Sequence, residues 1–290
     1  MASPSPVRPG PFLLASLAAA AGFAAVYLVF VRTNAGQNLD ERGLLESAAM
    51  FGAWSRTTLA FLNGMPAFSV VLAAAALCWA ALIRRRWVAS AIALVSALAA
   101  NAATYVLKQY VLDRPDLGHN ALGGNSMPSG HATLAASAAA AVYLAVTPRY
   151  RPLAAFAGAT YAVLAGVVML VNQWHLAADV VAAFLLVAAI AAPATWLALR
   201  TERASGTPPQ LRIRWERVSL RIALGAAVVA ALALMLVLVV PPEGWRVGTV
   251  PQFFAAGAAA ITASGYACSA AACRLVTRAA RRSHTASARP

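Results

Sequence analysis

The sequence has 290 residues, of which 61% are hydrophobic and only 11% are charged, and its mean hydropathy is +0.69. Soluble globular domains are about half apolar and about a quarter charged, so this composition excludes an ordinary water-soluble domain and predicts an integral membrane protein. The net charge of +14 is interpreted as arginines that face anionic lipid headgroups, and nucleic acid is not expected as a partner.

Eight stretches are long and apolar enough, some only with their flanks, to cross a bilayer. A hydrocarbon core about 30 Å thick needs about 20 helical residues at about 1.5 Å each. The fourth stretch is short and must begin with Gly130 and His131. The predicted fold is therefore all-α, a polytopic transmembrane helix bundle of about eight spans. The stretches cover roughly residues 12–31, 66–83, 87–107, 131–147, 152–171, 178–199, 219–240 and 252–276.

The first loop, residues 32–65, is the longest polar stretch of the chain. Asn38 and Glu41 have the spacing of a capping box, which starts a helix, and a rough apolar stripe begins at Leu44. We expect a short helix that lies in the membrane interface. An ordinary extracytoplasmic loop is the alternative interpretation.

The distribution of basic residues predicts the orientation. If the N-terminus is cytoplasmic and the loops alternate, 17 of the 23 basic residues lie inside. Cytoplasmic loops carry the excess of Lys and Arg, so both termini are predicted to be cytoplasmic, in the plasma membrane. The inside set is Arg8, Arg84, Arg85, Arg86, Arg149, Arg151, Arg200, Arg203, Arg212, Arg214, Arg217, Arg221, Arg274, Arg278, Arg281, Arg282 and Arg289. The outside set is Arg32, Arg42, Arg56, Lys108, Arg114 and Arg246.

The domain organisation follows from these spans. We predict a six-span core over residues 1–199, a cytoplasmic arginine-rich linker over 200–218, two additional spans within 219–276 and a basic cytoplasmic tail over 277–290. Cys78, Cys268 and Cys273 fall inside predicted spans, and their placement suggests neither a disulfide nor a metal site.

Two cations follow the third span, in the stretch LKQYVLDRPD. Lys108 is the only lysine of the chain, and a compact point charge suits an anion site. Pro115 disfavours helix at Arg114, so the helix must end between the two cations, and the loop can then fold Arg114 back beside Lys108. The alternatives are a lysine that snorkels to the membrane surface and neutralisation of both cations by Asp113 and Asp116.

The stretch from Pro128 to His131, Pro-Ser-Gly-His, opens the fourth span. Ser129 suits the N-cap position, and Gly130 allows close approach of the backbone. A helix N-terminus attracts phosphate through its N–H groups and dipole, and His131 in the first turn can pass a proton to a bound group. A helix cap with an incidental histidine is the alternative interpretation.

His175 and Asp179 are four residues apart at the start of the sixth span, which puts them on one helical face. The carboxylate can hold one imidazole nitrogen and leave the other free to attack, although a purely structural contact is the alternative. The three segments together predict an extracytoplasmic site for a phosphoryl group that needs no metal or cofactor. Because this site borders the bilayer, the expected substrate is a phosphorylated lipid.

At these residues the chain resembles the type 2 phosphatidic acid phosphatase family, which carries a Lys…Arg-Pro motif, a Pro-Ser-Gly-His motif and a Ser-Arg…His…Asp motif in that order. The resemblance covers about residues 87–199, and it implies six core helices and a phosphohistidine intermediate formed without metal. The implied roles are phosphate binding by Lys108, Arg114, Ser129 and Gly130, general acid catalysis by His131, nucleophilic attack by His175 and orientation of that nucleophile by Asp179.

The chain departs from the family pattern in two places. Its first motif is one residue shorter, and the family's Ser-Arg pair would fall on Val168 and Met169. Asn172 or Gln173 is expected to supply a donor instead, although a neutral donor is weaker than a charged one. The predicted function is hydrolysis of a polyprenyl (pyro)phosphate or a phosphatidic-acid-type lipid. A catalytically impaired or non-enzymatic relative and a lipid phosphotransferase are the alternatives.

Overall fold

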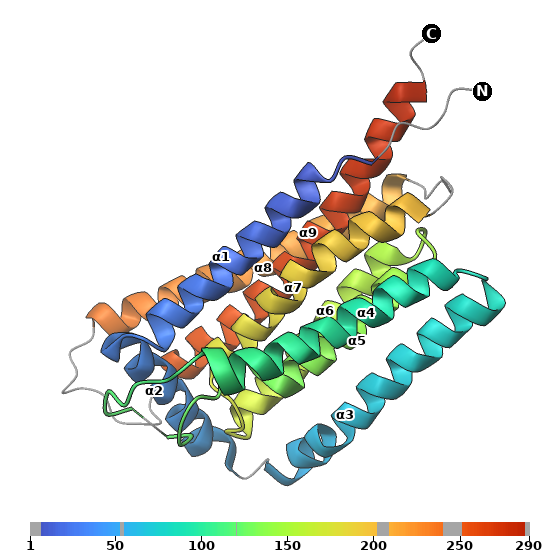
Figure 1. Cartoon of the computed structure of the whole chain (residues 1–290). Coiled ribbons are helices and arrows are strands. Elements are labelled where there is room, and N and C mark those ends of the chain that lie inside the picture. The colour runs from blue at the N-terminus through green and yellow to red at the C-terminus, as the bar shows by residue number, and fades with distance from the viewer. Residues whose placement is uncertain (1–6, 53–54, 120, 202–208, 240–250, 288–290) are drawn as a thin grey trace.

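The computed structural model describes residues 7–52, 55–119, 121–201, 209–239 and 251–287, and the regular elements in these ranges are all helical (Figure 1). This confirms the predicted all-α fold. Short π-helical segments, Trp79–Ile83 and Leu107–Val111, extend α3 and α4. The helices are α1 (Gly10–Phe30), α2 (Asn34–Phe51), α3 (Ser55–Cys78), α4 (Trp87–Val106), α5 (Gly130–Ala145), α6 (Arg151–Val171), α7 (Ala177–Thr201), α8 (Pro209–Val239) and α9 (Gln252–Ser287).

Seven helices in the described ranges are long and apolar enough to cross a membrane, which fits an integral membrane protein. The exception to the eight predicted spans is α5. It has 16 residues and is about 24 Å long, less than the hydrocarbon thickness of about 30 Å. The long helices run roughly along one axis in Figure 1, while α2 lies across one end of the bundle. The start of α1 and the end of α9 lie at the opposite end.

The structure describes only part of the predicted linker and tail. Residues 202–208 of the linker lie outside the described ranges, and α8 already begins at Pro209. At the C-terminus, α9 continues as a helix through 277–287 of the predicted tail. The last two helices pack on α6 of the core: a Cβ at Gly265 of α9 would meet the side chain of Val163 at 2.4 Å, and the ring of Trp215 of α8 lies 4.6 Å from that of Phe156. Such close approach through small residues is typical of membrane helix packing.

Helix α2 confirms the helix expected in the first loop, but the predicted capping box is wrong. The N-cap is Thr33, whose hydroxyl accepts the N–H of Gly36 at 3.0 Å. The helix therefore begins four residues before the predicted cap, Asn38. Glu41 does not reach back to its own helix, because its carboxylate accepts the backbone N–H of Ala121 at 2.8 Å.

The buried face of α2 is mostly polar, which differs in part from the expected apolar stripe: Leu44 is buried as expected, but Leu45 is 49% exposed and Gln37 is fully buried. Helix ends leave backbone N–H and C=O groups without partners inside the helix. Side chains of α2 supply partners at the ends of four other helices, so α2 closes this end of the bundle. The contacts are Gln37 Nε2 to Val31 O after α1, Ser47 Oγ to Leu170 O of α6, Asp40 to Ala178 N of α7 and Glu46 to Phe254 N of α9.

Candidate active site

The register between α4 and α5 places the lysine beside the start of α5. The hydroxyls of Thr104 and Thr133 lie 2.8 Å apart between the two helices. Lys108 is about one turn beyond Thr104, in the segment Leu107–Val111 that extends α4 towards this end of the bundle. The helical conformation then ends at Val111, so the predicted break before Arg114 is confirmed.

The loop that carries Arg114 turns its acidic residues away from this cation. Asp113 pairs with Arg32 at 2.6 Å, and Asp116 accepts the N–H of Gly118 at 3.0 Å. Within the described residues neither carboxylate forms an ion pair with Arg114 or Lys108. The geometry therefore does not support the alternative in which the two aspartates neutralise the two cations. The Arg114 guanidinium donates to the carbonyl of His119 at 3.4 Å, inside its own loop.

Ser129 begins α5 as an N-cap, as predicted: its Oγ accepts the N–H of Ala132 at 3.2 Å. The same hydroxyl donates to the sulfur of Met169 at 3.7 Å, and Ser129 is fully buried. Its backbone N–H donates to the carbonyl of Asp179 at 3.1 Å, which joins the start of α5 directly to α7. The hydroxyl of Ser129 is therefore engaged inside the protein, and the anion-binding capacity of this segment rests on the first N–H groups of α5, beginning at Gly130.

The end of α6 turns the chain sharply into the segment with the second histidine. Gln173 has φ of 59°, a left-handed conformation that is costly for residues other than glycine. The N–H of Trp174 bonds to the carbonyl of Met169 at 3.0 Å, and that of Gln173 bonds to Leu170 at 3.1 Å, the two bonds of a Schellman motif. Non-glycine residues held in this conformation cluster at functional sites.

Asn172 lies beside this turn. Its amide donates to the carbonyl of Val168 at 2.8 Å, and its Oδ1 accepts the hydroxyl of Thr58 at 3.0 Å. The bond from Thr58 attaches the end of α6 to the start of α3. An amide nitrogen carries two N–H donors, so one donor of Asn172 is left as a candidate phosphate contact.

His175 and Asp179 form the expected pair, but not on one helical face as predicted, because His175 lies in the turn before α7, which begins at Ala177. His175 Nδ1 lies 3.2 Å from Asp179 Oδ2, and the same oxygen accepts the N–H of Leu176 at 3.1 Å. Asp179 is fully buried and His175 is 7% exposed. If the Nδ1 proton faces the carboxylate, Nε2 keeps its lone pair for a ligand or an electrophile.

The two histidines face one another across the site. Their ring centroids are 6.4 Å apart, and the ring of Trp174 lies 5.3 Å from that of His131. The three segments singled out in the sequence therefore meet at the end of the bundle that α2 closes (Figure 1). Such an arrangement can bind and transfer a phosphoryl group. It offers one imidazole as a nucleophile, a second imidazole as a proton donor, a lysine and a helix N-terminus.

Met169 occupies the position at which the family pattern has an arginine, and its side chain is apolar and enclosed. Met169 is fully buried and accepts the hydroxyl of Ser129, so this position contributes packing beneath the start of α5 in place of charge. Asp40, Glu41 and His119 also lie around the site, although the sequence patterns did not place them there. The available signal was the concentration of acidic residues between 40 and 46 in a chain with only nine Asp and Glu.

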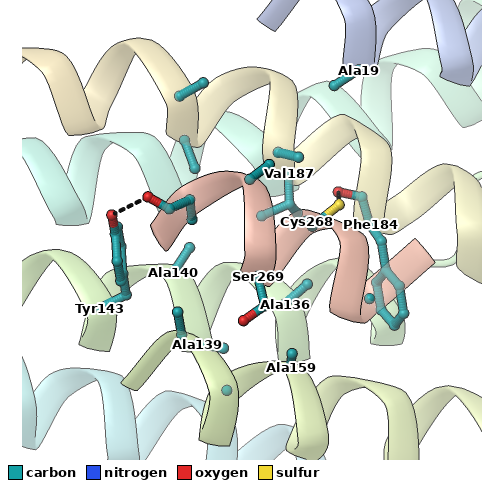
Figure 2. Close-up of a pocket in the computed structure, with 18 of the residues that line it drawn as sticks. Ala19, Ala136, Ala139, Ala140, Tyr143, Ala159, Phe184, Val187, Cys268 and Ser269 are labelled. Carbon is teal, nitrogen blue, oxygen red and sulfur yellow. Dashed lines mark hydrogen bonds between the residues drawn. The ribbon is translucent and has the colours of Figure 1, made fainter. Parts of the chain in front are cut away.

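An apolar cavity of about 410 Å³ lies among α1, α5, α6, α7 and α9 (Figure 2). Ala136 and Phe184 belong to its lining, and each is five residues along its helix from His131 or Asp179. The cavity therefore begins about 8 Å along the helices from His131 and Asp179. On α7 it extends to Thr195, a further distance of about 16 Å, which is about half of a hydrocarbon core.

The fold and geometry thus define a helical protein of the membrane type with two histidines side by side at one end of its bundle. Residues 89–203 match the family model of the PAP2 superfamily, which is consistent with a member of the type 2 phosphatidic acid phosphatase family. Members are mostly phosphatases, which supports a phosphoric ester hydrolase at the level of the family. Neither the curated proteins nor the solved structures include a match to the chain.

Proposed function

We propose that the protein is a lipid phosphatase of the plasma membrane that hydrolyses a lipid phosphate or pyrophosphate, with its site on the extracytoplasmic face. The observation that carries the proposal is the placement of His175, held through Nδ1 by Asp179, with its ring 6.4 Å from that of His131. The excess of arginines on the predicted cytoplasmic side supports the orientation.

In the first step Nε2 of neutral His175 attacks phosphorus. A P–N bond forms, the P–O bond to the lipid breaks, and His131 gives its proton to the leaving oxygen. Lys108, Arg114 and the N–H groups at the start of α5 stabilise the charge on the equatorial oxygens. The leaving group is a lipid alcohol or a lipid monophosphate.

In the second step water attacks the phosphohistidine. The P–N bond breaks, His131 accepts the proton that water loses, and inorganic phosphate departs with His175 neutral again. Protein groups supply each proton transfer and charge contact in this sequence, so activity in the presence of a chelator is expected.

The apolar cavity supports a substrate with a long hydrocarbon chain. Its labelled lining is dominated by alanines together with Val187 and Phe184 (Figure 2). A chain that passes from a headgroup between the two histidines into this space removes its apolar surface from water. A polyprenyl (pyro)phosphate and a phosphatidic-acid-type lipid both meet this description.

The test is phosphate release by the purified full-length protein from a panel of these lipids, measured with and without chelator. His175→Ala and His131→Ala are expected to abolish turnover while the thermal unfolding transition is retained. His284→Ala, near the end of α9, is the matched histidine control and keeps activity.

Each alternative has its own outcome. Wild-type rates in His175→Ala would refute the mechanism, and loss of activity in chelator would refute the metal-independent reaction. A protein that binds the lipids without turnover would be a non-enzymatic relative. A phosphorylated second product would identify a phosphotransferase.

A further inference from the structure

Asp40 is an acidic residue that the proposed reaction does not use. It lies in the middle of α2 and is only 6% exposed. It also lines a small cavity of about 120 Å³, whose other lining residues are mainly apolar and include Leu170 and Phe253. A buried carboxylate is costly unless hydrogen bonds or opposite charges compensate it, so its partners indicate what it does.

The partners of Asp40 are the first N–H groups of α7. Its two carboxylate oxygens lie 3.3 and 3.4 Å from the backbone nitrogen of Ala178, and the N–H of Ala177 also interacts with it. Ala178 is adjacent to Asp179, which binds His175. The first turn of α7 is thus held by two carboxylates, Asp179 from within the helix and Asp40 from α2.

Asp40 is also influenced by the charges of two segments of the site, α7 and the loop after α4. Asp179 on α7 and Arg114 in the 112–125 loop are the charged groups that act on it. The remaining charged groups of α2 face other elements: Glu41 faces His119 of the loop, and Arg42 and Glu46 face the start of α9. Arg32, which follows α1, is paired with Asp113.

We propose that Asp40 is a positioning residue for the reaction inferred above: it fixes the first turn of α7, and with it the approach of His175 to His131, and its charge tunes the anion affinity of Arg114. The inference rests on the proposed function. It assigns α2 a part in the site, because this helix joins the phosphate-binding loop to the helix of the proposed nucleophile.

The charge of Asp40 changes near neutral pH. Burial raises the pKa of Asp40 to about 7, with the nearby charge of Asp179 adding to the rise, while the N–H of Ala178 and the charge of Arg114 oppose it. Above this pH an anion stands near Arg114 and weakens its attraction for phosphate; below it the carboxyl is neutral. The KM of the wild-type protein should therefore rise as the pH increases through about 7.

The test compares Asp40→Ala, Asp40→Asn and Glu46→Ala in the full-length protein, with phosphate release measured from about pH 6 to 8. Asparagine keeps an acceptor for Ala178 and is a good helix cap. Asp40→Asn should retain kcat and lose the rise of KM with pH. Asp40→Ala should lower kcat by about 10- to 100-fold, because misplacement by about 1 Å can cost about 100-fold.

Glu46→Ala is the matched control, since Glu46 is also a buried carboxylate of α2 that binds a helix N-terminus, that of α9. It should keep kcat and the pH dependence of KM. Wild-type kcat in Asp40→Ala, or equal losses in Glu46→Ala and Asp40→Ala, would overturn the inference. If Asp40→Ala does not fold, a wild-type pH dependence of KM in Asp40→Asn would overturn it.

The two proposals fail in different ways. A wild-type protein that releases no phosphate from any lipid of the panel contradicts the proposed function itself. An active wild-type protein with unaltered Asp40 variants contradicts only the role of Asp40.

Discussion

At the scale of single residues, one oxygen of Asp179 has two functions. Oδ2 binds both the ring of His175 and the N–H of Leu176, so the carboxylate fixes the imidazole and the start of α7 together. Oδ1 is buried without a hydrogen-bond partner in the described part of the chain. The carboxylate therefore relies on the imidazole and one N–H for compensation.

Asp179→Asn tests this role. The amide can present an N–H to Nδ1 and thereby hold the wrong tautomer, so that Nε2 carries the proton and cannot attack. We expect kcat to fall by about 100- to 10,000-fold, the range that general acid–base groups contribute, with a preserved unfolding transition. Asp113→Asn is the control, because Asp113 is exposed in an ion pair with Arg32, and exposed ion pairs contribute little to stability. Equal kcat in the two variants would contradict the orienting role.

At the scale of elements, α2 shows where sequence patterns stop being informative. The spacings of Ser129 and of His175 with Asp179 are local, so the helix cap and the His–Asp pair could be predicted. Asp40 and Glu46 bind backbone groups 138 and 208 residues away, and no local pattern contains those partners. The same limit explains why the predicted capping box is wrong, because the carboxylate of Glu41 accepts the N–H of Ala121, which is 80 residues away in the sequence.

The burial of acids on α2 predicts how stability depends on pH. Burial raises the pKa of Asp40 from 3.8 to about 7, and it also raises that of Glu46. Over this interval the folded state keeps the Asp40 proton and the unfolded state has lost it, so the free energy of unfolding falls as pH rises from 3.8 to about 7. The contribution of Asp40 is about 4 kcal/mol at about 1.4 kcal/mol per pKa unit.

Denaturation of wild type and Asp40→Asn at several pH values measures this contribution. The amide cannot ionise, so the variant should show a shallower loss of stability between pH 3.8 and about 7 than wild type. Its relative stability should therefore increase as the pH rises. Parallel curves for the two proteins would show that the ionisation of Asp40 does not oppose folding.

At the scale of the whole molecule, the bundle places polar chemistry at one end and an apolar cavity below it. Alternation of spans predicts that the loops after α4 and α6 share one side, which is why the convergence of Lys108, His131 and His175 could be expected from sequence. The cavity could not, because its lining is mostly alanine from five helices, and alanine occurs in every predicted span. Only helix packing distinguishes an alanine that lines this space from one that faces lipid.

Ala188→Leu tests whether this cavity holds the substrate chain. Ala188 lines it on α7, whereas Ala99 of α4 is exposed on the outer surface of the bundle, so Ala99→Leu adds the same atoms without filling the cavity. If the chain lies in the cavity, Ala188→Leu raises KM for long-chain lipid phosphates and leaves kcat/KM for a short, water-soluble phosphate ester unchanged, because the short ester does not reach that depth. Ala99→Leu changes neither. Equal effects of Ala188→Leu on both substrates would mean that the substitution disturbs the site itself, and an unchanged KM for the long-chain lipids would place their chain outside this cavity.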